Sequence, residues 1–209
     1  MKTSSIKPNK KTKQNIMQTQ NTLTPAQEKK IALMQHLNED FFIIESEDGE
    51  VIIYEGNEED QRELFRNDIE GTEELEIETN FEIFCINNCT EVDEYDEDDY
   101  NNDYLVLTDE EADEKAKEYI IDTLWAFNAS FIASEIDLDE DVINAIQDNG
   151  KCEGNNDTIY NLINKLGDID SFVDSAISAD GRGHFMSSYD GNEKKENVNG
   201  TTYYIYRIN

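Results

Sequence analysis

Basic residues are scarce in this sequence. The chain of 209 residues contains 17 lysines and arginines against 49 aspartates and glutamates, which gives a formal net charge of −32. Duplex DNA carries one negative charge per about 1.7 Å of its axis, so a protein of this charge is repelled by it. The composition therefore excludes direct nucleic-acid binding by the acidic part of the chain and favours a basic protein surface as the partner.

Long apolar runs are also missing. The apolar run at 41–44 is among the longest and has only four residues, whereas a membrane-spanning helix needs about 20. The lysines near the N-terminus are not followed by an apolar segment, so the pattern of a secretory signal is absent. We therefore expect a cytoplasmic protein that does not associate with membranes.

Cysteine is rare and odd in number. Cys85, Cys89 and Cys152 leave at least one thiol unpaired within the chain, which predicts free thiols in a reducing compartment. A metal site built on Cys85 and Cys89 would need further ligands, and the chain has only two histidines. Phosphate-binding loops, dinucleotide fingerprints and zinc-protease motifs are absent as well. We expect no metal and no cofactor.

A calcium loop is the remaining metal pattern. Asp137, Asp139 and Asp141 fit the first three ligand positions of an EF-hand. However, Val142 replaces the required glycine, and Asp148 stands where a bidentate glutamate should close the loop. The segment also overlaps a helix predicted at 139–147, so we prefer the interpretation of an acidic helix start.

Charge and aromatic residues divide the chain into three parts. Residues 1–22 hold five lysines and no acid, while residues 67–114 hold 20 acids and no lysine or arginine. Ten tyrosines and nine phenylalanines indicate a folded core, because disordered chains are poor in aromatics. We predict a disordered basic tail at 1–22, a small helix and β-hairpin region at 23–70, and an acidic α+β core domain at 71–209.

Local patterns predict the elements of this α+β fold. Thr24 and Thr108 each precede a glutamine or glutamate by three residues, which is the signature of a capping box at a helix start. Strand-like runs at 41–46 and 51–55 flank an Asp-Gly turn and predict a hairpin. Further strands are expected at 75–78, 81–87, 104–107 and 202–208, and helices at 58–66, 139–147, 157–166 and 170–179. Together they predict a small, mostly antiparallel sheet packed with several helices, plus an N-terminal helix-hairpin appendage.

The acidic stretch around residues 93–113 is the first candidate site. One interpretation is a solvated loop; another is a decoy for a phosphate backbone, in which carboxylates occupy a basic groove. Interleaved tyrosines favour the decoy, since aromatic residues are enriched at interfaces. The proposed partner-binding residues are Asp93, Glu94, Tyr95, Asp96, Glu97, Asp98, Asp99, Tyr100, Asp103, Tyr104, Asp109, Glu110 and Asp113.

The polar loop at 180–191 is a possible second site. Asp180, Arg182, His184 and Tyr189 could form a catalytic or ligand-binding group. No nucleophile-elbow motif accompanies them, and catalytic groups need rigid support. The preferred interpretation is a structural loop in which Arg182 pairs with a local carboxylate.

Several strings resemble a known group of proteins. The segments FEIFCINNCTEVDEYD, YLVLTDEEADEKAKEYIIDTLWAFNASFIA and SFVDSAISADGRGHFMSSYDGNE, with the closing YYIYRIN, are similar to a family of small acidic bacteriophage proteins with no assigned activity. The resemblance covers about residues 81–209. It implies a phage protein in the cytoplasm of its bacterial host, similar in kind to DNA-mimicking antirestriction and anti-CRISPR inhibitors.

The expected function is therefore non-enzymatic inhibition of a host defence protein. The partner would be the basic surface of a host nucleic-acid-binding protein or nuclease complex, whose channel the acidic protein occupies. Two alternatives stay open: a phage enzyme or ligand-binding module centred on the 180–191 loop, and an accessory protein in which neither site matters alone.

Overall fold

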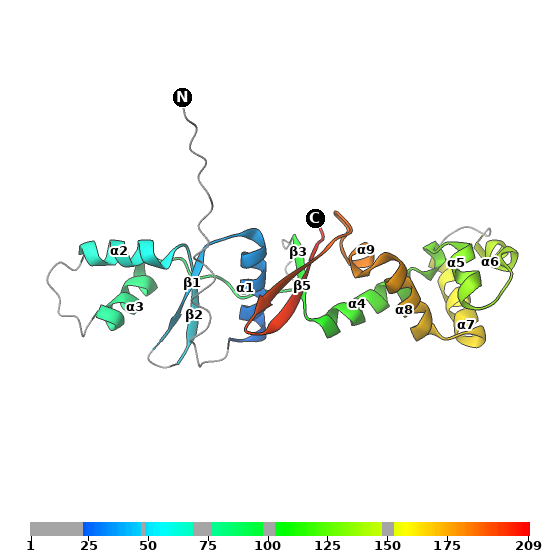
Figure 1. Cartoon of the computed structure of the whole chain (residues 1–209), viewed down its shortest axis with the longest axis horizontal. Coiled ribbons are helices and arrows are strands. Elements are labelled where there is room, and N and C mark those ends of the chain that lie inside the picture. Colours follow the sequence, from blue (N-terminus) through cyan, green and yellow to red (C-terminus); the bar gives the residue numbers. More distant parts are fainter. Residues whose placement is uncertain (1–22, 47–48, 69–76, 98–102, 148–152) are drawn as a thin grey trace, which may run out of the picture. The chain divides into compact units, whose positions relative to one another are not determined.

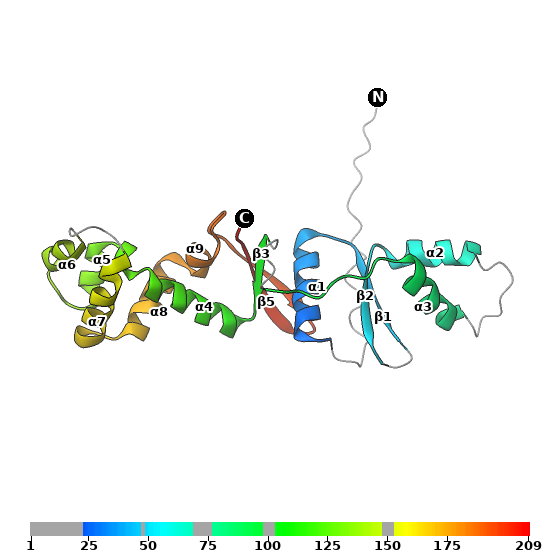
Figure 2. The same ribbon diagram turned by 180° about the vertical axis from the view of Figure 1, so that it is seen from behind.

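The computed structural model describes residues 23–46, 49–68, 77–97, 103–147 and 153–209 (Figure 1, and Figure 2 from behind). The chain forms two compact units. Unit 1 comprises Met1–Asp99 with Glu196–Tyr203, and unit 2 comprises Tyr100–Lys195 with Tyr204–Asn209. The boundary predicted from the sequence between the N-terminal region and the acidic core lies at 70/71, whereas the compact units divide at 99/100 and again within the C-terminal hairpin.

Helix α1 (Pro25–Leu37) opens unit 1 with the predicted capping box. The Thr24 hydroxyl accepts a hydrogen bond from the Gln27 backbone N–H, and the Gln27 side chain accepts one from the Thr24 N–H. Asn38 ends the helix in the left-handed conformation. Its buried face includes Ile31 and Met34, as the sequence pattern predicts.

The predicted hairpin follows α1. Strands β1 (Phe41–Glu45) and β2 (Val51–Glu55) pair in antiparallel register, from Phe41 opposite Glu55 to Glu45 opposite Val51. Helices α2 (Glu58–Asp68) and α3 (Ile77–Asn88) come next. The four elements share one core, which is formed by Phe42, Tyr54, Phe65, Phe81 and Cys85.

Helix α3 corrects the prediction of a strand at 81–87. The alternation of Phe81 and Ile83 suggested a strand, but the buried positions are Phe81 and Cys85, which are four residues apart on one helix face. Ile83 stays 51% exposed, so the two-residue period does not match the buried side. The strand expected at 75–78 lies partly outside the described residues; from Ile77 onward the chain is helical.

Unit 2 is built largely from helices. After β3 (Tyr104–Leu107) come α4 (Asp109–Asp122), a 3-10 turn at Leu124–Ala126, α5 (Ala129–Glu135), α6 (Glu140–Gln147), a 3-10 turn at Glu153–Asn155, α7 (Asn156–Leu166), α8 (Ile169–Asp180) and α9 (Arg182–Met186). Helix α4 packs against α7, α8 and α9. The predictions of a capped helix at Thr108 and of helices near 139–147, 157–166 and 170–179 are confirmed. Helix α5 was not predicted.

A three-stranded sheet completes the fold. Its order is β3-β5-β4, with β4 at Glu193–Val198 and β5 at Thr201–Arg207. Strands β3 and β5 pair antiparallel from Tyr104 opposite Arg207 to Leu107 opposite Tyr204. Small antiparallel sheets together with helices confirm the predicted α+β class. Every helix in the described part of the chain is too short or too polar to cross a bilayer.

Candidate functional site

The N-terminal half of the predicted acidic site lies in unit 1. Asp93, Glu94, Asp96 and Glu97 are exposed, but Tyr95 is only 8% exposed. The Tyr95 backbone N–H donates a hydrogen bond to the Ala26 carbonyl, which ties this segment to the start of α1. Tyr95 is therefore part of the core of unit 1 and is not accessible to a partner. Asp98, Asp99 and Tyr100 lie outside the described residues.

The next tyrosine of the predicted site belongs to the sheet. Tyr104 is half-buried at the start of β3, and the Arg207 guanidinium carbon lies 6.0 Å from its ring centroid. Asp103 is exposed, and its backbone carbonyl accepts a hydrogen bond from the Ile208 N–H at 2.8 Å. This part of the predicted site therefore fastens β3 to the end of the chain.

The structure brings residues of the two predicted sites together. Arg182, at the start of α9, is hydrogen-bonded through one terminal nitrogen to Asp109 at 2.9 Å and Asp113 at 2.8 Å on α4. Its Nε donates to Glu193 on β4 at 3.0 Å. We call Asp109 and Asp113, four residues apart on α4, the inner row. The prediction that Arg182 pairs with a local carboxylate holds for Glu193, 11 residues away in sequence, whereas Asp109 and Asp113 are remote in sequence and were not predicted as its partners.

Arg182 and its three carboxylate partners, which we call the arginine centre, interact closely because the arginine is buried. The Arg182 side chain is only 10% exposed, and its guanidinium carbon lies 4.2 Å from the centroid of the Tyr204 ring. Burial alone lowers the pKa of Arg182, but the hydrogen bonds to Asp109 and Glu193 outweigh it and raise the pKa above its ordinary value. The hydrogen bond from Arg182 likewise lowers the pKa of Asp109. The centre therefore holds its charges fixed at neutral pH.

Glu193 links the centre to the sheet. Its carboxylate accepts hydrogen bonds from the Tyr206 hydroxyl at 2.8 Å and from Arg182. Burial raises the pKa of Glu193, but these two hydrogen bonds outweigh it, and the net pKa is lowered. Burial raises the pKa of the Tyr206 phenol, and the bond to Glu193 raises it further. Tyr206 therefore stays a hydrogen-bond donor.

Close packing holds the segment that carries Arg182. A Cβ on Gly183 would lie 2.6 Å from the Gly191 carbonyl oxygen, so only glycine allows α9 to approach the 191–193 backbone. The buried Ser187 hydroxyl lies 2.8 Å from both an Asp190 carboxylate oxygen and the Arg207 carbonyl oxygen. The segment predicted as a flexible loop is thus a short helix followed by a tightly bonded turn.

The remaining residues of the second predicted site are exposed. Asp180 ends α8, and His184 is exposed on α9 with its ring edge-on to Phe185. Tyr189 is 60% exposed, and the Arg207 guanidinium carbon lies 3.7 Å from its ring centroid. Among the described residues, no hydrogen bond joins the His184 imidazole to a carboxylate or a hydroxyl. The geometry does not assemble a nucleophile and a base around this histidine.

A second row of carboxylates runs along the solvent side of α4. Its members recur every four residues and are all exposed: Glu110, Glu114, Glu118 and Asp122. The buried face of the same helix is formed by Ala112, Ala116 and Ile120. None of the four carboxylates makes an ion pair with another residue that the structure describes. We call these four residues the outer row.

Only Glu110 of the outer row was among the predicted site residues. The other three were not predicted, although the four-residue spacing of acids along a capped helix is a signal for them in the sequence. Like charges four residues apart on a helix are destabilising. Repulsion between neighbouring carboxylates of the outer row therefore opposes the stability of α4, although Glu110, in the first turn, complements the positive end of the helix dipole.

Within the described ranges, no cluster of three or more histidine, cysteine, aspartate or glutamate side chains is arranged to hold a metal ion. No protein-family model, curated protein or solved structure matches this chain.

Proposed function

We propose that this protein is a non-enzymatic inhibitor that occupies the basic nucleic-acid channel of a bacterial defence protein by mimicking a phosphate backbone. The observation that carries the proposal is the outer row, formed by Glu110, Glu114, Glu118 and Asp122 on the exposed side of α4. A four-residue repeat on an α-helix spaces the carboxylates by roughly 6 Å along the axis. They form a line of negative charge at regular intervals, as phosphates do.

Rigidity favours the outer row over the flanking acidic segment. Helix α4 starts with a capping box, in which the Thr108 hydroxyl accepts from the Glu111 N–H and the Glu111 carboxylate accepts from the Thr108 N–H. Arg182 ties the first turns of α4 to α9 and β4. Carboxylates on such a support lose little conformational entropy when a partner binds.

An exposed aromatic side chain lies next to the outer row. Tyr119 follows Glu118 on α4 and is 49% exposed, while its ring packs 6.3 Å from that of Phe185. Tyrosine and arginine are enriched at binding hot spots. Tyr119 therefore takes the role of aromatic anchor that was predicted for Tyr95, Tyr100 and Tyr104.

Charge sets the expected binding behaviour. A protein of net charge −32 approaching a basic groove is steered by long-range attraction, so association is fast and becomes slower as salt rises. The target's own nucleic acid competes for the same groove, because both ligands use the same lysines and arginines.

The test is a tagged pull-down from bacterial lysate, eluted with a salt gradient, with the bound proteins identified by mass spectrometry. We expect recovery of a nucleic-acid-binding protein that its own RNA or DNA displaces. A variant with Glu110→Gln, Glu114→Gln, Glu118→Gln and Asp122→Asn should lose this protein. The matched control neutralises four exposed acids elsewhere in unit 2, through Glu135→Gln, Asp137→Asn, Glu140→Gln and Asp174→Asn, and should retain it.

Equal losses in both variants would mean that net charge, and not the outer row, determines binding. Recovery of no nucleic-acid-binding protein, or capture that the outer-row variant leaves unchanged, would overturn the proposal.

A further inference from the structure

The outer edge of strand β1, the edge that faces away from β2, is defined by the hydrogen bonds of the hairpin. In an antiparallel ladder, alternate residues direct their N–H and C=O groups toward the neighbouring strand, and the residues between them direct theirs away. The Ser46 N–H donates to the Glu50 carbonyl at 2.8 Å, just beyond one end of the paired strands. The Gly56 N–H donates to the Asp40 carbonyl at 2.8 Å, just beyond the other end. These two bonds fix which residues of β1 bond to β2.

The alternation assigns a direction to each residue of β1. Phe42 and Ile44 direct their backbone groups toward β2, whereas Phe41 and Ile43 direct theirs to the outer edge. Among the residues that the structure describes, none is hydrogen-bonded to the backbone N–H or C=O of Phe41 or Ile43. The outer edge of β1 therefore presents donors and acceptors for a further strand.

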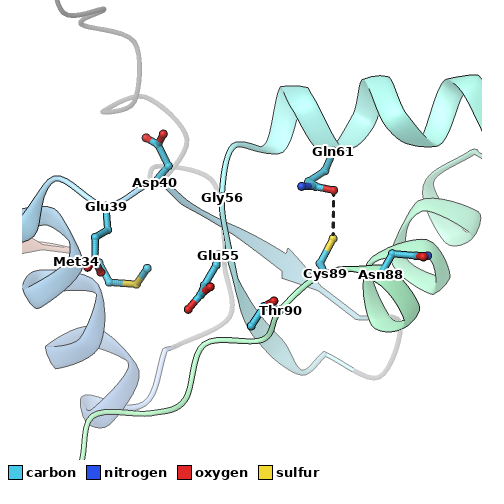
Figure 3. A pocket seen from close by; sticks show the side chains of 9 residues that line it. All are labelled: Met34, Glu39, Asp40, Glu55, Gly56, Gln61, Asn88, Cys89 and Thr90. Atoms are coloured by element: carbon cyan, nitrogen blue, oxygen red, sulfur yellow. Dashed lines mark hydrogen bonds between the residues drawn. The ribbon is translucent and has the colours of Figure 1, made fainter. Parts of the chain in front are cut away.

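The opposite edge of the hairpin is already covered. Ile53 and Glu55 of β2 direct their backbone groups away from β1, and both are paired: the Val92 N–H donates to the Ile53 carbonyl at 2.8 Å. The Glu55 N–H donates to the Thr90 carbonyl at 2.9 Å, and Figure 3 shows Thr90 beside Glu55. In the described part of the chain, one edge is thus closed by residues 90–92, and the other has no neighbouring strand.

A second edge strand of this protein shows how an edge is normally protected. Strand β4 lies at the edge of the three-stranded sheet, and its sequence EKKENV includes Lys194 and Lys195. Charged side chains, lysine above all, discourage the addition of another strand. Strand β1 has the sequence FFIIE, without lysine or proline, and it pairs with β2 in continuous register. It therefore lacks the features that keep edge strands unpaired.

Charge selects the kind of strand that fits this edge. Residues 39–55 contain seven aspartates and glutamates and no lysine, arginine or histidine. Glu39 and Asp40, just before β1, are exposed (Figure 3), and so is Glu50. A second copy of the hairpin would bring the same acids against these, and like charges across an interface are unfavourable. A strand with lysine or arginine side chains is complementary to the edge.

We propose that the outer edge of β1 binds an extended segment of a partner protein, in which lysine or arginine alternates with apolar residues, as an added β-strand. The backbone of this segment bonds to the N–H and C=O groups of Phe41 and Ile43. Its apolar side chains extend the side of the sheet that carries Phe42 and Ile44, and its cations lie near the acids that flank β1. The inference does not rest on the proposed function, because the outer row belongs to unit 2.

Amide exchange of the full chain, followed residue by residue by NMR, tests the proposal. The probe is an acetylated and amidated seven-residue peptide that alternates lysine with valine. We expect saturable binding that slows exchange of the Phe41 and Ile43 amides by about tenfold or more. A peptide with proline in place of each valine has the same charge but fewer backbone donors, so it should leave both amides unprotected.

A pair of variants at the first residue of β1 gives a second measurement. Phe41→Pro removes an outward N–H at a position where an edge strand tolerates proline, and Phe41→Val removes the ring but keeps that N–H. We expect the lysine–valine peptide to bind the proline variant about fivefold or more weakly than the valine variant. Circular dichroism shows whether both are folded; should the proline variant unfold, the exchange measured on the unaltered chain decides alone.

Two results would overturn the proposal. Equal protection by both peptides, or equal affinity of the two folded variants, would assign the binding to general attraction between a polycation and an acidic protein. Slow exchange of the Phe41 and Ile43 amides before any peptide is added would show that another part of the chain, or a second copy, already occupies the edge.

Discussion

The two rows of carboxylates on helix α4 differ in what faces them. Asp109 and Asp113 of the inner row share one buried guanidinium, whereas the outer row faces solvent. The inner row fastens α4 to α9, and the outer row, only one residue further along the chain, makes no ion pair with the described residues. Acids that look equivalent in sequence thus divide into those that stabilise the fold and those available for binding.

The comparison also shows that a high density of charge does not identify a site. From the sequence, the acids from 93 to 113 were predicted to form one surface. In the structure some of them are fixed by an arginine, others flank a buried tyrosine, and a third set extends along α4 beyond the predicted limits. The partner of each carboxylate, and not the number of carboxylates, separates these roles.

The largest expected effect on stability comes from removing Arg182, the cation that pairs with the inner row. Arg182→Ala leaves Glu193, whose side chain is 19% exposed, without its guanidinium, and also removes the stacking on Tyr204. We expect the free energy of unfolding to fall by about 2–3 kcal/mol, measured by urea denaturation. Arg182→Lys keeps the charge but loses the forked geometry, so its loss should be intermediate.

Lys117→Ala is the matched control for this prediction, because Lys117 pairs with Asp170 on the surface. Exposed pairs contribute little, so its effect should be the smaller one. If both substitutions lower the free energy of unfolding by the same amount, the contacts of Arg182 with the inner row do not stabilise the fold more than a surface pair does, and the two rows do not differ in this respect.

A smaller effect is expected from the protonation of Glu193. Because its folded-state pKa lies below the ordinary value of 4.5, Glu193 stabilises the fold above that pH, and this contribution is lost as pH falls through the lowered pKa. Glu193→Gln should therefore show a flatter loss of stability in acid than the unaltered chain. The measurement is the free energy of unfolding of both proteins from neutral to acidic pH.

Glu135→Gln removes one carboxylate from an exposed position and is the control. Because both variants have lost the same amount of charge, the difference between their two profiles isolates the contribution of Glu193. Parallel profiles for the Glu193 variant and the unaltered chain would contradict the prediction.

The smallest expected effect is the change in stability when two carboxylates of one row are neutralised, and its sign should be opposite for the two rows. Glu114→Gln with Glu118→Gln removes repulsion between like charges, and we expect a gain of a few tenths of a kcal/mol in stability. Asp109→Asn with Asp113→Asn makes the same change in charge but weakens the contacts to Arg182, so thermal unfolding should occur at lower temperature. A loss of stability in the outer-row variant would show that these carboxylates have a structural partner.

Local signals made much of the fold predictable. The capping boxes at Thr24 and Thr108 involve groups only three residues apart, and both are confirmed. The hairpin of β1 and β2 also follows from local turn chemistry. Strand β4 was missed because its sequence, EKKENV, is polar; the usable signal was Asn199-Gly200, which has positive φ at both residues and forms the turn into β5.

Long-range contacts explain what sequence reasoning could not supply. A pair between Arg182 and a local carboxylate was predicted, but no spacing rule connects Arg182 to Asp109 on another helix. Helix α3 was mistaken for a strand because short apolar runs fit both periods, and the packing of Phe81 and Cys85 onto the hairpin decides between them. The outer row could have been predicted, because the four-residue spacing of its acids is visible in the sequence.

The distance in sequence between Arg182 and Asp109, 73 residues, has a consequence for folding kinetics. Closing so long a loop costs entropy before any contact forms, whereas α4 starts from a capping box of neighbouring residues. We therefore expect helix α4 to form early in folding and its contacts to Arg182 to form late. With that order of events, changes in helix propensity along α4 should alter the rate of folding, and loss of the arginine contacts should mainly raise the rate of unfolding. The lifetime of the folded state that presents the outer row to solvent should then depend on Arg182, which is not part of that row.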